Sequence, residues 1–152
     1  MDAPDFLEMI GRLALAVLLG GTLGWERELH QKPAGLRTHI LVALGAAGFA
    51  ILALEMAAKQ DGVDPSRIIQ GIIGGIGFLG AGTIIQSRGD VRGMTTAAGI
   101  WATAAIGVAC GLGEYALAVT LAVLAFIVLS AALAVEKRLV RGLTKEDGAG
   151  ED

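Results

Sequence analysis

Apolar stretches long enough to cross a lipid bilayer alternate with short polar segments along most of this chain. Residues 68–87, 93–113 and 115–135 contain no Asp, Glu, Lys or Arg. Of these four residue types, residues 38–58 contain only Glu55, and residues 6–25 contain Glu8 and Arg12. A helix needs about 20 predominantly apolar residues to cross the hydrocarbon core of a membrane. The pattern therefore predicts five transmembrane helices, over about 6–25, 38–58, 68–87, 93–113 and 115–135.

The composition favours a membrane over an aqueous environment. Hydrophobic residues make up 54% of the chain and charged residues 18%, whereas soluble domains usually carry about 25% charged residues. A soluble all-α bundle is the alternative, but helices that are apolar on every side have too little polar surface to face water. We therefore predict an all-α, polytopic membrane bundle over residues 1–136, followed by a short cytoplasmic tail over residues 137–152.

Positively charged side chains are concentrated on one side of the predicted topology. With five spans, nine of the 12 Lys and Arg residues fall in the first connection, the third connection and the tail. Because Lys and Arg are enriched in cytoplasmic loops, the N-terminus is predicted outside and the C-terminus in the cytoplasm. The acidic N-terminus does not resemble a secretory signal, so the first helix is expected to be retained. A four-span alternative, with the first helix at the membrane surface, would place the N-terminus inside.

Glycine is concentrated in the third apolar segment, where Gly71 and Gly75 form a GxxxG pair. Small residues let membrane helices approach closely, so we predict Gly-rich packing between the third and fourth helices. A second interpretation is that the glycines break the helix and expose backbone carbonyls to an ion, as in some transporters. The residues predicted to mediate helix packing are Gly71, Gly75, Gly77, Gly80 and Gly82.

Charged residues of both signs flank the first connection, on the side predicted to be cytoplasmic. Glu26 and Arg27 follow the first apolar segment, and Arg37 precedes the second. Basic residues alone would anchor the chain to lipid phosphates, but the interleaved acids would weaken such a patch. We therefore predict an ionic network that joins this connection to the third one (88–92), with neighbouring threonines as helix caps. The candidate functional cluster is Glu26, Arg27, Arg37, Thr38, Arg92, Thr95 and Thr96.

Three sequence motifs carry a resemblance to a known family. Gly-Trp-Glu-Arg at 24–27, with Ala-Gly-Leu-Arg-Thr-His at 34–39 and Leu-Val-Ala-Leu-Gly-Ala at 41–46, resembles the first signature of the MgtC/SapB family. Gly-Ile-Gly-Phe-Leu-Gly-Ala-Gly at 75–82 is similar to the second. Val-Arg-Gly-Met-Thr-Thr-Ala-Ala at 91–98, with Trp101, is similar to the third. The resemblance covers roughly residues 8–135, in order and with short gaps.

The resemblance implies a multi-pass protein of the bacterial inner membrane. Members of the family are associated with growth at low magnesium and with survival inside macrophages. Some are linked to inhibition of the F-type ATP synthase, which is the partner that the resemblance implies. Longer members carry a small soluble α/β domain, similar to an ACT domain, after the last span. This sequence ends soon after its last predicted span, so no role of that domain is carried over to it.

Several classes of chemistry find little support in the sequence. Residues 75–80 match the GxGxxG pattern of dinucleotide-binding folds, but they lie inside an apolar segment rather than between a strand and a helix. Neither His30 nor His39 has a nucleophile or base at motif spacing, which disfavours an enzyme. The single Cys110 lies in an apolar segment, where a small packed residue is expected. We therefore predict no catalytic, cofactor-binding or metal-binding residues, and no nucleic-acid partner.

Two functions remain open, a regulatory protein and a transporter. A non-enzymatic regulator that acts through other membrane proteins suits close-packing helices with short loops. A magnesium transporter is the alternative, but Mg²⁺ prefers carboxylate oxygens, and only Glu8 and Glu55 are acids near the predicted spans. Acids on the predicted outer side are interpreted as a solvated loop rather than a cation sensor. Those acids are Glu55, Asp61, Asp64 and Glu114. The sequence does not decide whether the chain forms a homo-oligomer.

Overall fold

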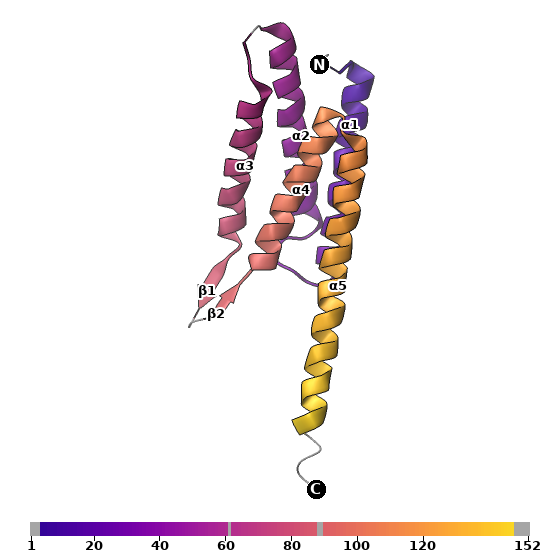
Figure 1. Ribbon diagram of the computed structural model, residues 1–152, viewed down its shortest axis with the longest axis vertical. Coiled ribbons are helices and arrows are strands. Elements are labelled where there is room, and N and C mark those ends of the chain that lie inside the picture. The colour runs from indigo at the N-terminus through magenta and orange to yellow at the C-terminus, as the bar shows by residue number, and fades with distance from the viewer. Residues whose placement is uncertain (1–3, 61, 88–89, 148–152) are drawn as a thin grey trace.

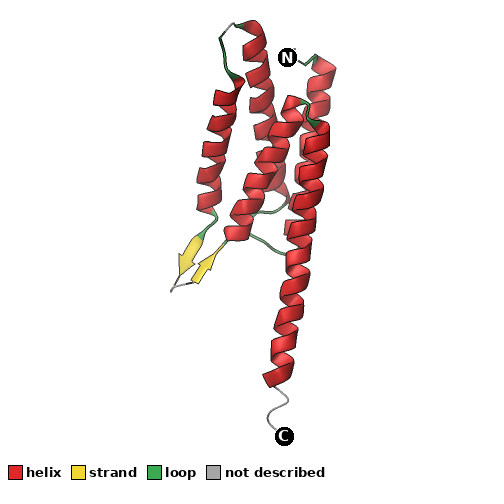
Figure 2. Cartoon of the chain, in the orientation of Figure 1, coloured by secondary structure: helices red, strands yellow, loops and turns green. Residues whose placement is uncertain are grey.

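The computed structural model describes the backbone of residues 4–60, 62–87 and 90–147, and the side chains in these ranges as far as residue 131, apart from residue 87. Within these residues the chain forms five helices and one short hairpin (Figures 1 and 2). The helices are α1 (Phe6–Leu29), α2 (Leu36–Lys59), α3 (Pro65–Gly82), α4 (Met94–Leu112) and α5 (Tyr115–Asp147). The hairpin strands are β1 (Ile85–Ser87) and β2 (Asp90–Arg92). The predicted all-α class is confirmed.

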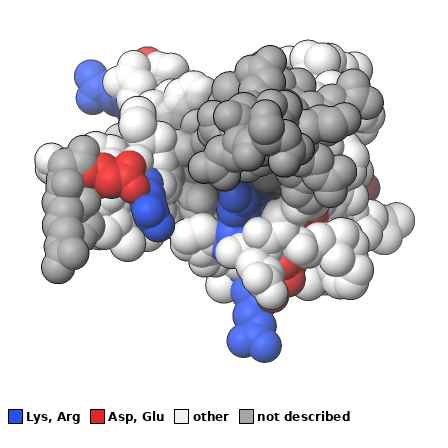
Figure 3. All heavy atoms as spheres, turned by 90° about the horizontal axis from the view of Figure 1, so that it is seen from below, with Lys and Arg blue, Asp and Glu red and all other residues white. Residues whose placement is uncertain are grey.

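The connections alternate between the two ends of the bundle. The α1–α2 connection, the hairpin and the C-terminal part of α5 lie at one end, at the bottom of Figure 1, and the N-terminus lies at the other. We call the lower end the basic end, because it carries Arg27, Lys32, Arg37 and Arg92. The opposite end, with the α2–α3 connection and the α4–α5 turn, is called the far end. Viewed from below, the basic end presents both Lys or Arg and Asp or Glu side chains (Figure 3).

Local sequence signals explain where two of the helices begin. Asp5 caps α1 by accepting the backbone N–H of Glu8 at 2.7 Å. Asp64 caps α3 by accepting the N–H of Ser66 at 2.9 Å, and Pro65 occupies the first helical position. Side-chain oxygens at this position satisfy one of the free N–H groups of the first turn, and proline there has no N–H to lose. Asp64 and Pro65 therefore set the start of α3.

The predicted threonine caps are wrong. The N-cap of α2 is Gly35 and that of α4 is Gly93, and neither forms a side-chain cap hydrogen bond. Both helices begin one or two residues before the threonines, so these side chains fall inside the first turn rather than at its start. The threonines that the sequence predicted as caps are Thr38, Thr95 and Thr96.

The third helix ends earlier than the predicted segment 68–87. α3 stops at Gly82, and residues 85–87 instead form β1, which pairs antiparallel with β2 in the register Ile85↔Arg92. The β-branched run Thr83, Ile84 and Ile85 suits an extended backbone better than a helix. Gly93, between β2 and α4, has φ 92°. A Cβ at this position would collide with the carbonyl oxygen of Thr83, which precedes β1. Residues 88 and 89, between the strands, lie outside the described residues.

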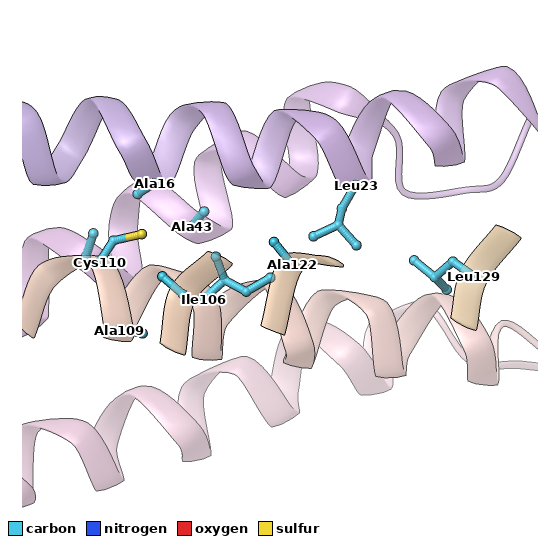
Figure 4. Packing of buried hydrophobic residues seen from close by; sticks show 10 residues of the cluster. Ala16, Leu23, Ala43, Ile106, Ala109, Cys110, Ala122 and Leu129 are labelled. Atoms are coloured by element: carbon cyan, nitrogen blue, oxygen red, sulfur yellow. The ribbon is translucent and has the colours of Figure 1, made fainter. Parts of the chain in front are cut away.

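α2 is the central helix, and it packs closely against α1 and α4 through glycine. A Cβ on Gly20 of α1 would lie 2.7 Å from the Cβ of Ala43. A Cβ on Gly111 of α4 would lie 2.5 Å from the carbonyl oxygen of Ala47, and one on Gly107 would collide with that of Ala43. Small residues on facing helices allow this approach of the backbones. The resulting core is rich in alanine, with Ile106, Cys110 and Leu23 among its larger members (Figure 4).

α3 packs more loosely, and a Cβ added to most of its glycines would meet no described atom within 4 Å. Only Ile76 and Gly80 of this helix are buried. A Cβ on Gly80 would lie 3.6 Å from the Cβ of Ala97 on α4, so these two helices do meet there. The other glycines of the predicted packing set have no atom within 4 Å of an added Cβ. Those glycines are Gly71, Gly75, Gly77 and Gly82.

Some of the described helices have the length and surface of membrane-spanning segments. Three of those described, α1, α2 and α4, are long and apolar enough to cross a membrane. The described apolar part of α5 is Tyr115–Ala131, and α3 has 18 residues. Large apolar side chains such as Phe6, Phe78 and Val128 project outward, as expected for contact with lipid. The predicted tail from residue 137 continues as α5 to Asp147, and its side chains lie outside the described residues.

Candidate functional site

Two charged residues at the C-terminal end of α1 are buried in the bundle. Glu26 is 3% exposed and Arg27 is 2% exposed. The Nε of Arg27 donates to Glu26 Oε2 at 2.6 Å, and Nη2 donates to Oε1 at 3.2 Å. The His30 ring lies one turn further on, with Nδ1 2.8 Å from the carbonyl oxygen of Glu26. Because a buried charge is tolerated when it is paired and hydrogen-bonded, the two residues form a neutral unit at the basic end.

His39 of α2 is fully buried next to this pair. Its Nδ1 donates to the carbonyl oxygen of Gly35 at 3.0 Å, which assigns the ring proton of the neutral form to Nδ1. Nε2 then carries a lone pair, and it has no hydrogen-bond partner among the described residues. On α4, a Cβ at Gly99 would lie 3.6 Å from this nitrogen. The ring is therefore held between α1 and α4 with one polar atom unsatisfied.

Two threonines of α4 are also buried polar side chains. Thr96 is 3% exposed and Thr103 is fully buried. The hydroxyl of Thr103 donates to the carbonyl oxygen of Gly99 at 2.8 Å. Polar side chains inside membrane bundles normally satisfy each other or the backbone in this way. We use the name buried polar cluster for the buried polar residues of the basic half of the bundle, which are Glu26, Arg27, His39, Thr96 and Thr103.

The other residues of the predicted functional cluster are exposed and lie outside the buried polar cluster. Arg37, Thr38 and Thr95 are exposed. Arg92 pairs with Asp90 at 2.7 Å across the hairpin, and its side chain is 83% exposed. The predicted ionic network between the first and third connections is therefore not formed among the described residues, and Arg88 lies outside them. The candidate set therefore divides in two. Glu26, Arg27 and Thr96 are buried, and the remaining residues are exposed. We call the exposed arginines, Arg37 and Arg92, the exposed basic rim.

Glu28 ties the first connection to the second helix. Its Oε2 accepts the backbone N–H of Leu36 at 3.0 Å. A side chain on Gly35 would collide with the Glu28 carboxylate, so glycine at this position makes room for the bond. A carboxylate at a helix N-terminus also interacts favourably with the helix dipole. Glu28 therefore fixes the angle between α1 and α2 just outside the buried polar cluster.

A second buried guanidinium lies at the far end of the bundle. Arg12 of α1 is 7% exposed, and its Nη1 donates to the carbonyl oxygen of Gly111 at 2.6 Å. Nη2 donates to Glu8 Oε1 at 2.6 Å, while Nε has no partner among the described residues. A Cβ on Gly113 would lie 2.9 Å from Nη2. Arg12 therefore joins α1 to the end of α4.

The described side chains do not assemble a metal centre. Within the described ranges, no group of three or more His, Cys, Asp or Glu residues could hold a metal ion. Glu55 pairs with Lys59 at 3.0 Å. The Asp64 carboxylate accepts hydrogen bonds from the side chain and backbone of Ser66, which holds the pKa of Asp64 below its ordinary value. Asp61, the remaining acid of that loop, lies outside the described residues.

Sequence reasoning missed three residues that the structure makes prominent. Arg12, His39 and Thr103 are all buried and absent from the predicted cluster. The signal was present for two of them, because an ionisable residue inside an apolar segment is costly in lipid and usually has a partner. Thr103 gave no such signal, since threonine is common in membrane helices and its bond is to its own helix.

Taken together, the fold and the site define a helical integral membrane protein with polar residues buried near each end. The model of the MgtC family matches residues 13–138, and the chain belongs to this family. It is similar to the putative magnesium transporter YhiD of Escherichia coli K12, with 43% identity over 127 residues, which cover 80% of this chain and 59% of YhiD.

Proteins named MgtC are similar to the chain over the same region. Protein MgtC of Salmonella typhimurium LT2 is 49% identical over 114 residues, covering 74% of this chain and 48% of that protein. Protein MgtC of Brucella abortus is 48% identical over 101 residues, covering 66% and 41%. The chain thus spans about half the length of the curated relatives it matches. None of these names assigns a reaction, and no solved structure gives a significant match.

Proposed function

We propose that this chain is a non-catalytic protein of the bacterial inner membrane that regulates other membrane proteins by helix–helix docking. In this proposal its basic end faces the cytoplasm and its N-terminus lies outside, as the distribution of Lys and Arg favours. Adaptation to low magnesium is the setting that family membership suggests. The proposal rests on one observation, which is that the acids near the ends of the bundle are already paired or hydrogen-bonded within the chain.

Each described acid on the helices predicted to span the membrane already has a partner. Glu8 pairs with Arg12, Glu26 with Arg27 and Glu55 with Lys59. Glu28, at the end of α1, accepts the N–H of Leu36. A path for Mg²⁺ would need free carboxylate oxygens to replace part of its hydration shell. In each of these acids at least one carboxylate oxygen is already engaged within the chain, which supports a structural role for them.

The interior between the two buried arginines also favours regulation over transport. Arg12 and Arg27 are about 22 Å apart along α1, at a rise of about 1.5 Å per residue. Buried apolar side chains lie between them, and include Ala16, Leu23 and Ile106 (Figure 4). A hydrated divalent cation entering from either end would meet a guanidinium and then this apolar layer.

The docking surface that we propose is the outward face of α3. Gly74 and Gly77 have no atom within 4 Å of an added Cβ, and Phe78 is 81% exposed. The glycines of the inner bundle differ, since Gly107 and Gly111 are covered by the backbone of α2. Because small residues mediate helix association in lipid, uncovered glycines on α3 suit a helix of another protein.

A site-specific photo-crosslinker at Gly74 tests this docking in inner-membrane vesicles. The F-type ATP synthase, implied by the family resemblance, is the first partner to examine, and ATP hydrolysis by the vesicles is measured in parallel. We expect an adduct with one of its membrane subunits and a lower hydrolysis rate when the protein is present. The matched control places the crosslinker at Leu18, which is also exposed but lies on α1. Equal adducts from both positions would remove the assignment to α3.

Magnesium transport is the second candidate, because the similar protein YhiD is named a putative magnesium transporter. Magnesium flux into liposomes that contain only this protein separates the two candidates. The proposal expects no flux above that of protein-free liposomes. Protein-dependent flux that Glu55→Gln abolishes would favour transport and overturn the regulatory proposal.

A further inference from the structure

A groove of about 730 Å³ lies between α2 and α3. Its walls are almost entirely apolar, and glycine at 45, 71 and 75 leaves it wide. Val42 and Ile76, which are buried, form part of its floor. We call it the α2–α3 groove. Its lining on α2 includes Leu41, Gly45 and Phe49, and its lining on α3 includes Ile68, Gly71, Gly75 and Leu79.

The groove has the length of one membrane leaflet. On α2 its lining runs from Arg37 to Phe49, which is about 18 Å at a rise of about 1.5 Å per residue. The hydrocarbon core of a bilayer is about 30 Å thick, so one leaflet is about 15 Å. The groove begins at the basic end and stops part of the way along α2, which continues to Lys59. A transmembrane helix needs about 20 residues and would extend well past the groove, whereas an acyl chain of one leaflet would not.

A single cation lies at the open end of this apolar groove. Arg37 and Thr38 line the groove at the basic end and are exposed. Arg37 forms no ion pair with any acid among the described residues, whereas Arg27 and Arg92 at the same end are both paired. Guanidinium groups bind phosphate oxygens with two parallel hydrogen bonds. The groove thus combines an apolar channel of leaflet length with one guanidinium at its basic end that is not paired with any described acid.

We propose that the α2–α3 groove holds an anionic phospholipid, with one acyl chain along the groove and its phosphate at Arg37. The lipid fills the space that glycine leaves between the two helices and supplies an anion to Arg37, which has no ion-pair partner among the described residues. The proposal concerns the groove face of α3, and it stands whether or not a partner docks on the outward face.

Tryptophan quenching by brominated lipids tests this inference. Trp25 and Trp101 are replaced by Phe, and Phe49→Trp places one fluorophore, called the groove fluorophore, at the far end of the groove from Arg37. The protein is reconstituted into vesicles in which either phosphatidylglycerol or zwitterionic phosphatidylcholine carries bromine on its acyl chains, at equal mole fraction. The matched control, Leu18→Trp in the same background, places the fluorophore on the exposed face of α1.

We expect phosphatidylglycerol to quench the groove fluorophore preferentially and to quench the Leu18→Trp control no better than phosphatidylcholine does. The preference should correspond to about five-fold tighter binding, since one cation near the surface contributes about 1 kcal/mol toward an anionic lipid. Arg37→Gln should abolish the preference, and Lys32→Gln, at the same end but outside the groove, should leave it unchanged. Gly75→Leu should also reduce it by filling the groove, with Arg37 still in place.

Three results would overturn the inference. Equal quenching of the groove fluorophore by both lipids would mean that the groove does not select an anionic headgroup. A preference that survives Arg37→Gln would remove the assigned phosphate ligand. Protection of the groove fluorophore from both lipids would mean that a second copy of the chain, or another helix, fills the groove instead.

Discussion

The guanidinium of Arg12, near the start of α1, donates a 2.6 Å hydrogen bond to the carbonyl oxygen of Gly111, near the end of α4. Helix C-termini leave carbonyl groups without an intrahelical partner, and inside a membrane no bulk water is present to satisfy them. Arg12 supplies that donor from another helix, and Glu8 balances its charge. The far end of the bundle is therefore closed by a residue that the apolar pattern alone would count as a defect.

Replacing Arg12 by Ala should destabilise the bundle by about 1–3 kcal/mol, the cost of leaving a buried hydrogen-bonding group unsatisfied. Glu8→Gln should cost less, because the Glu8 side chain is 44% exposed and exposed ion pairs contribute about 0–1 kcal/mol. Unfolding by SDS, followed by circular dichroism, compares the two variants. Equal losses would mean that the ion pair, rather than the bond to Gly111, holds this end.

Removing one partner of the buried Glu26–Arg27 pair should be more damaging. Glu26→Ala leaves an unpaired buried guanidinium, which typically costs about 3–5 kcal/mol. The double change to leucine at both positions should cost less than Glu26→Ala alone, because no unpaired charge remains. Asp90→Asn is the control, since it breaks an exposed pair. A double variant less stable than the single one would contradict this account.

The glycine contacts of α2 predict which helix positions tolerate a methyl group. Gly107→Ala places a Cβ against the backbone of Ala43, and overpacking of this kind costs about 1–3 kcal/mol. Gly48→Ala, on α2 itself, meets no atom within 4 Å and should leave stability unchanged or slightly raised. Thermal unfolding in detergent separates them. Similar midpoints for the two variants would show that the helices can move apart freely.

The exposed basic rim carries a functional prediction. Arg37→Ala or Arg92→Ala should weaken complementation of a low-magnesium growth defect severalfold more than Arg141→Ala, although the side chains of Arg37 and Arg92 are exposed and their loss should not unfold the protein. Membrane levels of the three variants, measured by immunoblot, control for expression. Equal complementation by all three variants would remove this rim from the functional site.

The start of α3 should respond to acid in a defined direction. Hydrogen bonds from Ser66 lower the pKa of Asp64 below its ordinary 3.8, so the cap is fully present at neutral pH and is lost as pH falls through the lowered value. The amide chemical shift of Ser66 should titrate with a midpoint below 3.8. Ser66→Ala should move the midpoint of the shift at position 66 upward. Asp64→Asn, which keeps an acceptor at the cap, should remove the titration.

The sequence was sufficient to predict where the helices lie along the chain, but not which helices pack against one another. Apolar runs located the five helices because the length of such a run is a local property of the chain. The end of α3 was missed because residues 83–87 carry no charge, so the uncharged segment continues through them. The β-branched Thr83, Ile84 and Ile85 nevertheless favour an extended backbone. Gly107 and Gly111 pack closely while Gly71 and Gly75 do not, and nothing local distinguishes these two GxxxG pairs. Which pair is covered depends on which helices become neighbours.

The candidate site shows the same division. Glu26 and Arg27 were found because charges of opposite sign follow an apolar segment, and they do form a pair. Their predicted link to Arg92 failed because the hairpin carries that side chain outward, where Asp90 neutralises it. Pairing between distant loops depends on the path of the backbone, which charge patterns do not encode.

The backbone contacts at Gly20, Gly107 and Gly111 have a consequence for how this molecule can move. Helices α1, α2 and α4 approach so closely at these points that an added Cβ would overlap the neighbouring helix, and such close packing opposes sliding or tilting between them. α3 has no such interlocking, and it is attached through Ile76, Gly80 and two connections. In a conformational response of the described bundle we therefore expect α3 and its hairpin to move as a unit relative to α1, α2 and α4, which stay in place.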